Sequence, residues 1–118
     1  MTMDKILDFI FSNSDLYTLD QREELGKALE KHVEYGTLLV LYDNDKIVGI
    51  CRWNTDDWIT FYVIDVIISK DYRFHKLLQQ MVRWGKDNFP SFTYIHFERG
   101  QKKNNKFRTL EVKKFLKE

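Results

Sequence analysis

The first 36 residues carry apolar side chains that repeat every three to four positions, in two blocks. The apolar side chains of the first block fall on one face of a helix: Met3, Ile6, Leu7, Ile10 and Phe11. This spacing predicts a short amphipathic helix over residues 3–11. A second helix is expected to begin at Asp20, which forms an acidic variant of the capping pattern with Glu23, and to end at Gly36.

From Thr37 onward the apolar positions follow the pattern of strands. Two clusters typical of turns separate three strand-like segments, which cover residues 38–42, 46–54 and 58–69. The third segment contains a single charged residue, Asp65. Three strands joined by two short turns predict an antiparallel meander.

Helical spacing returns at Asp71 and is expected to stop at Phe89, because the residue before Pro90 is driven out of the helical region. A further strand is predicted over residues 92–97. A strand, a helix and a strand in this order form a right-handed crossover, which places the two strands parallel. Beyond Gly100, alternation around Leu110 and Val112 indicates an edge strand. The elements together predict an α+β fold.

Length and composition favour one globular domain. The chain has 118 residues, of which 43% are hydrophobic and 15% aromatic, enough for one modest core. The formal net charge of +1 creates no strong overall field, and the lone Cys51 fits a reducing compartment. No apolar run is long enough to cross a membrane, and Asp4 and Asp8 interrupt the apolar start, unlike a signal peptide. We expect one cytoplasmic domain over residues 1–118, with residues 100–118 as a basic extension.

The charge is concentrated near the C-terminus. Five cations close to the predicted last strand are candidates for contacts with nucleic acid: Arg99, Lys102, Lys103, Lys106 and Arg108. Phosphates attract such clusters, and Phe107 is available to stack on a base. The alternative is a solvated terminus without a partner. A protein partner for this basic segment is the other possibility that the charge pattern leaves open.

Two stretches carry a resemblance to a known family. Residues 45–53 resemble a hairpin strand, and residues 66–73 the lead into the main helix, of the GNAT acetyltransferases. Residues 97–100 and the basic segment are similar to small GNAT-like proteins of phage genomes. The resemblance implies a GNAT-like fold with N-terminal helices, a meander, a helix and a crossover strand. It also implies acetyl-CoA as a cofactor, and a location in a host cytoplasm or virion.

The resemblance implies a cofactor site at the start of the main helix, where backbone N–H groups hold a pyrophosphate. Arg73 matches the first motif position, and His75 and Lys76 add charge, so these three are the candidate cofactor contacts. The two positions that are small in the family hold Lys76 and Leu78, and the bulky Phe74 directly follows Arg73. A hydrogen bond to a charged group contributes about 1.5–3 kcal/mol, so blocking two or three predicts weak acetyl-CoA binding.

Candidates for acid–base chemistry are few. Asp65 and Tyr62, on the long strand, are the predicted catalytic pair. A charge inside this apolar strand is expensive to bury unpaired, which favours a role for Asp65 as a site carboxylate. The competing interpretation, which we favour for Asp65, is a solvent-facing position on an exposed face of the sheet. The histidines lack metal-ligand spacing, so no metal site is predicted. Cys51 is expected to fill the core.

The sequence therefore leads to three hypotheses. The first is a GNAT-related domain, possibly from a phage genome, that binds acetyl-CoA poorly and acts as a binding or accessory module, without a cofactor and without acetyltransferase activity. The second is an active N-acyltransferase that uses acetyl-CoA. The third is a nucleic-acid-binding module that uses the basic segment. None of the three involves a membrane.

Overall fold

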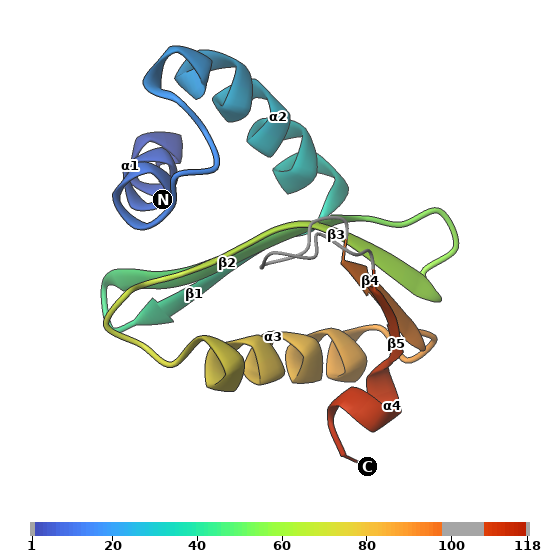
Figure 1. Cartoon of the computed structure of the whole chain (residues 1–118). Helices are drawn as coiled ribbons and strands as arrows, with labels where there is room; N and C mark the ends of the chain where they lie inside the picture. The colour runs from blue at the N-terminus through green and yellow to red at the C-terminus, as the bar shows by residue number, and fades with distance from the viewer. Residues whose placement is uncertain (1, 98–107, 118) are drawn as a thin grey trace.

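A five-stranded mixed sheet separates two helical layers in the computed structural model, which describes residues 2–97 and 108–117 (Figure 1). Helices α1 and α2 lie on one face of the sheet, and α3 and the short α4 lie on the other. The predicted α+β architecture is thereby confirmed. No helix in the described ranges combines the length and the apolar character that crossing a membrane requires.

The N-terminal layer consists of α1 (Met3–Asn13), the 3-10 turn η1 (Leu19–Gln21) and α2 (Arg22–Tyr35). The predicted cap at Asp20 and Glu23 is wrong. Thr18 and Gln21 form the capping box instead, and Leu19–Gln21 winds as a tight turn before α2 begins. Gly36 ends α2 as predicted, because its φ of 73° lies in the left-handed region that a side chain disfavours.

The sheet has the strand order β1-β2-β3-β4-β5. The strands are β1 (Leu38–Asp43), β2 (Lys46–Asn54), β3 (Thr60–Ile68), β4 (Tyr94–Phe97) and β5 (Arg108–Glu111). The first three form the predicted antiparallel meander, and β4 runs parallel to β3 as the crossover requires. The predicted edge strand is β5, which pairs antiparallel with β4, although Val112 already belongs to the next helix.

Three predicted boundaries extend too far, and local hydrogen bonds explain each. Strand β3 begins at Thr60 rather than 58, because the Asp57 carboxylate accepts the backbone N–H groups of Ile59 and Thr60. Helix α3 (Phe74–Asn88) begins three residues after Asp71, since the preceding residues form a turn. Strand β4 begins at Tyr94 because the Phe92 N–H is bonded to the Phe89 carbonyl in another turn.

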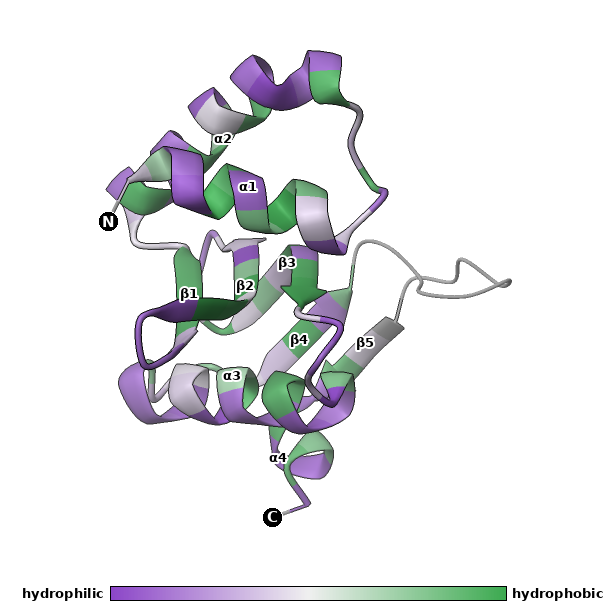
Figure 2. Cartoon of the chain, turned by 90° about the vertical axis from the view of Figure 1, so that its left-hand side faces the viewer, coloured by the Kyte–Doolittle hydropathy of each residue, from purple (hydrophilic) through white to green (hydrophobic). Residues whose placement is uncertain are grey.

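Each face of the sheet covers its own hydrophobic core (Figure 2). The core under α1 and α2 includes Ile10, Leu29 and Ile50, which are almost completely buried. The core under α3 includes Met81 and Phe92. Helix α4 (Val112–Phe115) joins this second core through Val112, which is 1% exposed. Part of the basic extension is therefore built into the fold.

Candidate functional site

A cleft of about 1220 Å³ lies between residues of β3 and β4 and the start of α3. Its wall is formed by residues of β3, α3, β4, β5, α4 and the loop after α1. The wall includes Ile64, Asp65, Phe74, His75 and Leu78. The volume is comparable to or somewhat larger than typical sites for small molecules and cofactors, and the wall is mainly apolar with a few polar groups, as such sites commonly are.

A bulge interrupts the pairing of β3 with β2 beside the cleft. Arg52 of β2 pairs with Asp65, whereas the next residue, Trp53, pairs with Val63, so Ile64 is an additional residue in β3. All four residues of β4 pair with β3, from Thr60 to Val63. A bulge bends its strand and redirects the side chains beside it. The β3 residues around the bulge line the cleft: Val63, Ile64, Asp65 and Val66.

Asp65 is buried in a cluster of three polar side chains. The Arg52 Nε donates to Asp65 Oδ2 at 2.5 Å, and the Tyr17 hydroxyl lies 2.9 and 2.7 Å from the two carboxylate oxygens. The Arg52 Nη2 also donates to the Tyr17 hydroxyl at 2.8 Å. We call Tyr17, Arg52 and Asp65 the buried charge cluster. Asp65 is only 2% exposed, so the expectation that it faces solvent is wrong.

The buried charge cluster was missed by the sequence interpretation, although a signal was present. Arg52 is the charged residue inside the apolar part of β2, just as Asp65 is in β3. Opposite charges on adjacent antiparallel strands are candidates for a cross-strand pair. Tyr17 lies 48 residues before Asp65 in a loop, so no local pattern connects the two.

The second predicted catalytic residue, Tyr62, lies apart from the cleft. Its side chain is 36% exposed, and its ring lies 5.7 Å from the ring of His96. Tyr62 does not contribute to the cleft wall, whereas Asp65 does. The structure therefore does not bring the predicted catalytic pair together around one reacting atom.

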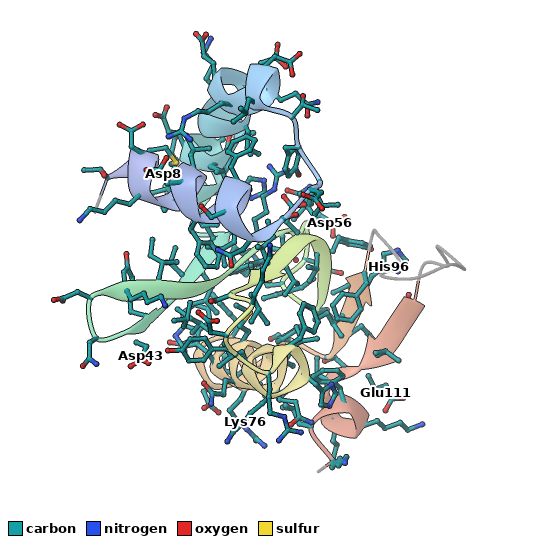
Figure 3. The ribbon with its side chains drawn as sticks, turned by 60° about the vertical axis from the view of Figure 1, so that its left-hand side comes forward. Asp8, Asp43, Asp56, Lys76, His96 and Glu111 are labelled. Atoms are coloured by element: carbon teal, nitrogen blue, oxygen red, sulfur yellow. The ribbon has the colours of Figure 1, made fainter. Side chains whose placement is uncertain are left out.

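The start of α3 forms the other polar border of the cleft. Arg73 occupies the N-cap position, and no acidic residue lies in the first turn. His75 contributes to the cleft wall, and its ring lies 5.8 Å from that of Phe115. Arg73 and Lys76 are exposed outside that wall, and Lys76 lies on the side of α3 that faces away from the sheet (Figure 3). We call Arg73, His75 and Lys76 the helix-start group.

Two large side chains occupy the inner side of the same helix start. Leu78 is 7% exposed and belongs to the core under α3, and Phe74 packs against that core. Both also form part of the cleft wall. The family resemblance places a small residue at the position of Leu78, and Phe74 directly follows the matched Arg73. Large apolar side chains therefore lie at the inner border of this cleft, where the resemblance implies accessible backbone.

Comparison with known proteins identifies the family. Residues 4–107 match the family described as the acetyltransferase (GNAT) family, which is most of the chain. The chain belongs to the GNAT family. No curated protein sequence matches it significantly.

Solved structures of other GNAT proteins share the fold at low sequence identity. An aminoglycoside 6'-acetyltransferase type Ii superposes with a TM-score of 0.64 and 12% identity, over 80% of this chain and 62% of that one. A GNAT family protein from Streptococcus pneumoniae TIGR4 gives 0.64 and 18%, over 89% and 74%. An aminoglycoside 6'-N-acetyltransferase complexed with coenzyme A gives 0.62 and 13%, over 80% and 53%. This GNAT chain thus spans less than two thirds of two of these three proteins.

Burial shifts the pKa of two further side chains of this GNAT domain, Cys51 and His32. Burial, together with the charge of Asp65, raises the pKa of Cys51 to about 12, so the thiol stays protonated and fills the core as predicted. Burial and the nearby Arg52 lower the pKa of His32, whose Nδ1 lies 2.8 Å from the Thr37 hydroxyl. Among the described residues, no three His, Cys, Asp or Glu side chains converge as a metal site.

The predicted nucleic-acid contacts lie largely outside the described residues. Arg99, Lys102, Lys103 and Lys106 belong to residues 98–107, and Arg108 is the first residue of β5. The use of these cations for nucleic acid stays a prediction.

Proposed function

We propose that this chain is a GNAT domain that binds acetyl-CoA weakly and acts as a small binding or accessory module. The observation that carries this proposal is the position of Phe74 and Leu78, whose side chains fill the inner border of the cleft at the start of α3. An anion is held at a helix start by backbone N–H groups that it can approach closely. Large side chains at these positions keep a diphosphate away from those groups.

The arrangement around Asp65 supports the same proposal. A general base must reach the proton that it removes, within hydrogen-bond distance. Asp65 is engaged by Arg52 and by Tyr17, and it would have to give up one of these contacts to accept a proton from a substrate. The residues present therefore fit acetyl-CoA and acetyl transfer poorly, and we assign no catalytic step to them.

Thermal unfolding with and without acetyl-CoA tests this proposal. A ligand at a hundred times its dissociation constant stabilises a protein by about 2.7 kcal/mol, which corresponds to a rise in Tm on the order of 10 °C for a domain of this size. We expect a rise of no more than about 2 °C at about 1 mM acetyl-CoA, as for a dissociation constant at or above that concentration. A rise of several degrees in the unmodified protein would contradict weak binding.

A pair of variants tests whether side-chain bulk causes the weak binding. Phe74→Gly removes a side chain from the cleft wall, whereas Gln80→Gly removes an exposed side chain of α3 outside the wall. Both variants place glycine in α3, and each rise in Tm is measured against the same variant without acetyl-CoA. We expect Phe74→Gly to increase the acetyl-CoA-dependent rise in Tm more than Gln80→Gly does. Equal rises in Tm for the two variants would show that the Phe74 side chain is not the cause of weak acetyl-CoA binding.

An active N-acyltransferase is the second candidate, and the composition of the α3 start favours it. The first turn contains no carboxylate to repel a phosphate, and His75 lies in the cleft wall. In this case Arg73, His75 and Lys76 would bind acetyl-CoA through charge. Release of free coenzyme A in the presence of a panel of primary amines is the test, with Arg73→Ala/Lys76→Ala as the control. Release that requires both cations would favour this candidate over the first.

The resemblance to phage proteins and the cytoplasmic location remain predictions about the source. A coding gene flanked by phage structural or replication genes would support a phage origin. A gene in a conserved bacterial operon without phage genes would contradict it.

A further inference from the structure

Two exposed tryptophans meet near the C-terminal end of α3. Trp58, in the turn between β2 and β3, is 39% exposed, and Trp84 of α3 is 37% exposed. Both rings contact Phe89, at centroid distances of 5.0 Å for Trp58 and 5.8 Å for Trp84. Figure 1 shows that this turn and the end of α3 lie at the same end of the sheet. We call Trp58, Trp84 and Phe89 the tryptophan patch.

The tryptophan patch is separate from the cleft and rests on the core under α3. None of its three residues contributes to the cleft wall. Trp58 packs edge to face on the buried Phe61, and Trp84 packs in a similar way on the buried Trp53. The exposed rings are therefore held in place by the core. Joined apolar side chains at a surface mark interaction sites more often than isolated ones do.

The turn that presents Trp58 is held in a strained conformation. The φ of Trp58 is 60°, in the left-handed region that bulky residues rarely adopt. The Trp58 N–H donates to Thr55 Oγ1 at 3.0 Å, and the same hydroxyl donates to the Thr60 carbonyl at 2.8 Å. The Asp57 carboxylate accepts the next two backbone N–H groups. Strained residues that their neighbours hold in place are concentrated at functional sites.

Carboxylates border the tryptophan patch. Asp56 and Asp57 directly precede Trp58, and the backbone N–H groups bound to Asp57 lower its pKa. Asp87 lies three residues after Trp84, and residues three apart are neighbours on the surface of a helix. All three carboxylates belong to exposed residues. The border of the patch is therefore negatively charged.

The cations at this end of α3 face away from Trp84. Arg83 lies one residue before Trp84 and Lys86 two residues after it, and such positions do not face each other on a helix. The Lys86 ammonium donates to the backbone carbonyls of Pro90 and Phe92, at 3.0 and 3.1 Å. The surface around the two tryptophans thus combines aromatic rings with negative charge, which is complementary to a cationic ligand.

Arginine fits this combination better than other cations of proteins. A guanidinium stacks on the face of an indole and presents a planar fork of donors to a carboxylate. A lysine ammonium is a strongly hydrated point charge that makes no planar contact. Tryptophan and arginine are also enriched among the residues that contribute most to protein–protein binding.

We propose that the tryptophan patch binds an arginine-containing segment of a partner protein. The guanidinium stacks on the exposed indole surface of Trp58 or Trp84, and its N–H groups pair with the carboxylates at the border. This interaction does not depend on acetyl-CoA, because the patch and the cleft wall share no residue. It extends the accessory role by naming a surface and the chemistry of the partner.

Fluorescence anisotropy with a labelled, capped peptide of alternating arginine and glycine tests the proposal. We expect saturable binding that weakens with salt, because the carboxylates are exposed. The same peptide with citrulline in place of arginine keeps the shape and loses the charge, and it should bind at least about tenfold more weakly. A lysine peptide of equal charge should also bind more weakly, since it cannot stack.

Variants of the patch identify the surface that binds the peptide. Trp58→Gly removes one ring, and glycine adopts the φ of 60° without strain, so the turn can keep its shape. We expect this variant to weaken binding about tenfold. Asp87→Asn removes one charge at the border and should weaken binding about two- to fivefold, with a smaller dependence on salt.

Tyr42→Ala is the matched control. Tyr42 is 47% exposed and precedes the carboxylate of Asp43, but it pairs with Ile47 at the far end of β2 from the Trp58 turn. It should leave the affinity unchanged. Equal affinity for the arginine and citrulline peptides would overturn the proposal, as would equal losses in Tyr42→Ala and Trp58→Gly. Self-association of the unmodified protein that Trp58→Gly abolishes would show that a second copy of the chain covers the patch instead.

The indole N–H signals of the unmodified protein in a nuclear magnetic resonance spectrum give a test without a substitution. The chain has three tryptophans, and Trp53 is the internal reference because it is only 3% exposed. The arginine peptide should shift the signals of Trp58 and Trp84 more than that of Trp53. Unchanged signals from Trp58 and Trp84, or equal shifts at all three, would overturn the proposal even if the variants fail to fold.

Discussion

Two polar regions border the cleft, and they differ in almost every physical respect. The buried charge cluster has a carboxylate that is 2% exposed and holds three side chains from a loop and two strands in mutual contact. The helix-start group has two exposed cations and a histidine at the edge of the cleft. The buried charged side chains bind one another, whereas the exposed cations are accessible to a ligand. A charged residue inside an apolar strand, such as Asp65, can thus be bound by other protein side chains rather than by a ligand.

The largest effect is expected from breaking the buried charge cluster. Asp65→Leu leaves Arg52 buried without its carboxylate, so we expect the free energy of unfolding to fall by about 3–5 kcal/mol. Urea denaturation followed by circular dichroism measures this loss. The double variant Arg52→Met/Asp65→Leu removes both charges and should recover much of the stability. If the free energy of unfolding of Asp65→Leu falls by less than about 1 kcal/mol, the contacts within the cluster contribute little to stability.

Removing only the tyrosine hydroxyl should have a smaller effect. Tyr17→Phe keeps the ring and deletes the contacts to Asp65 and Arg52, so we expect a loss of about 1–3 kcal/mol in the free energy of unfolding. Tyr35→Phe is the control and should be neutral, because Tyr35 is largely exposed. A double-mutant cycle with Asp65→Leu should show strong non-additivity. Simple additivity would mean that Tyr17 contributes through packing alone.

His32, which lies near Arg52 of the buried charge cluster, is expected to make the stability depend on pH. The pKa of His32 is lowered from 6.5, first by burial and then by the charge of Arg52. Protons therefore bind the unfolded chain more readily than the folded one. The contribution of His32 to stability is complete above pH 6.5, decreases as the pH falls below 6.5, and levels off below the folded pKa. Unfolding measured across this range should show a flatter profile for His32→Asn, and an identical profile would exclude His32 as the source.

The smallest effect on stability is expected at the helix-start group. Arg73→Ala and Lys76→Ala should each change the free energy of unfolding by less than about 0.5 kcal/mol, because both side chains are exposed. Lys31→Ala, on the exposed side of α2, is a matched control. Thermal unfolding at two salt concentrations is the measurement. A fall of more than about 1 kcal/mol in the free energy of unfolding would show that the exposed cations also stabilise the fold, as the buried charge cluster does.

Most elements of the fold could be predicted because their signals are local. Apolar spacing identified the helices and strands, Gly36 and Pro90 marked two helix ends, and the strand–helix–strand order implied the parallel pair. Boundaries were less predictable. The carboxylate of Asp57 and the turn before α3 each shifted an element start by two or three residues, through hydrogen bonds that periodicity does not encode.

The sequence by itself determined the α+β class, the order of the elements and the side chains at the start of α3, because these depend on neighbours in the chain. The tertiary structure alone decided the role of Asp65. Its burial depends on the register of β2 against β3, on the additional residue Ile64, and on a hydroxyl from Tyr17, 48 residues away. An isolated carboxylate in a strand is costly to bury, and only the convergence of Arg52 and Tyr17 from distant segments makes that burial favourable.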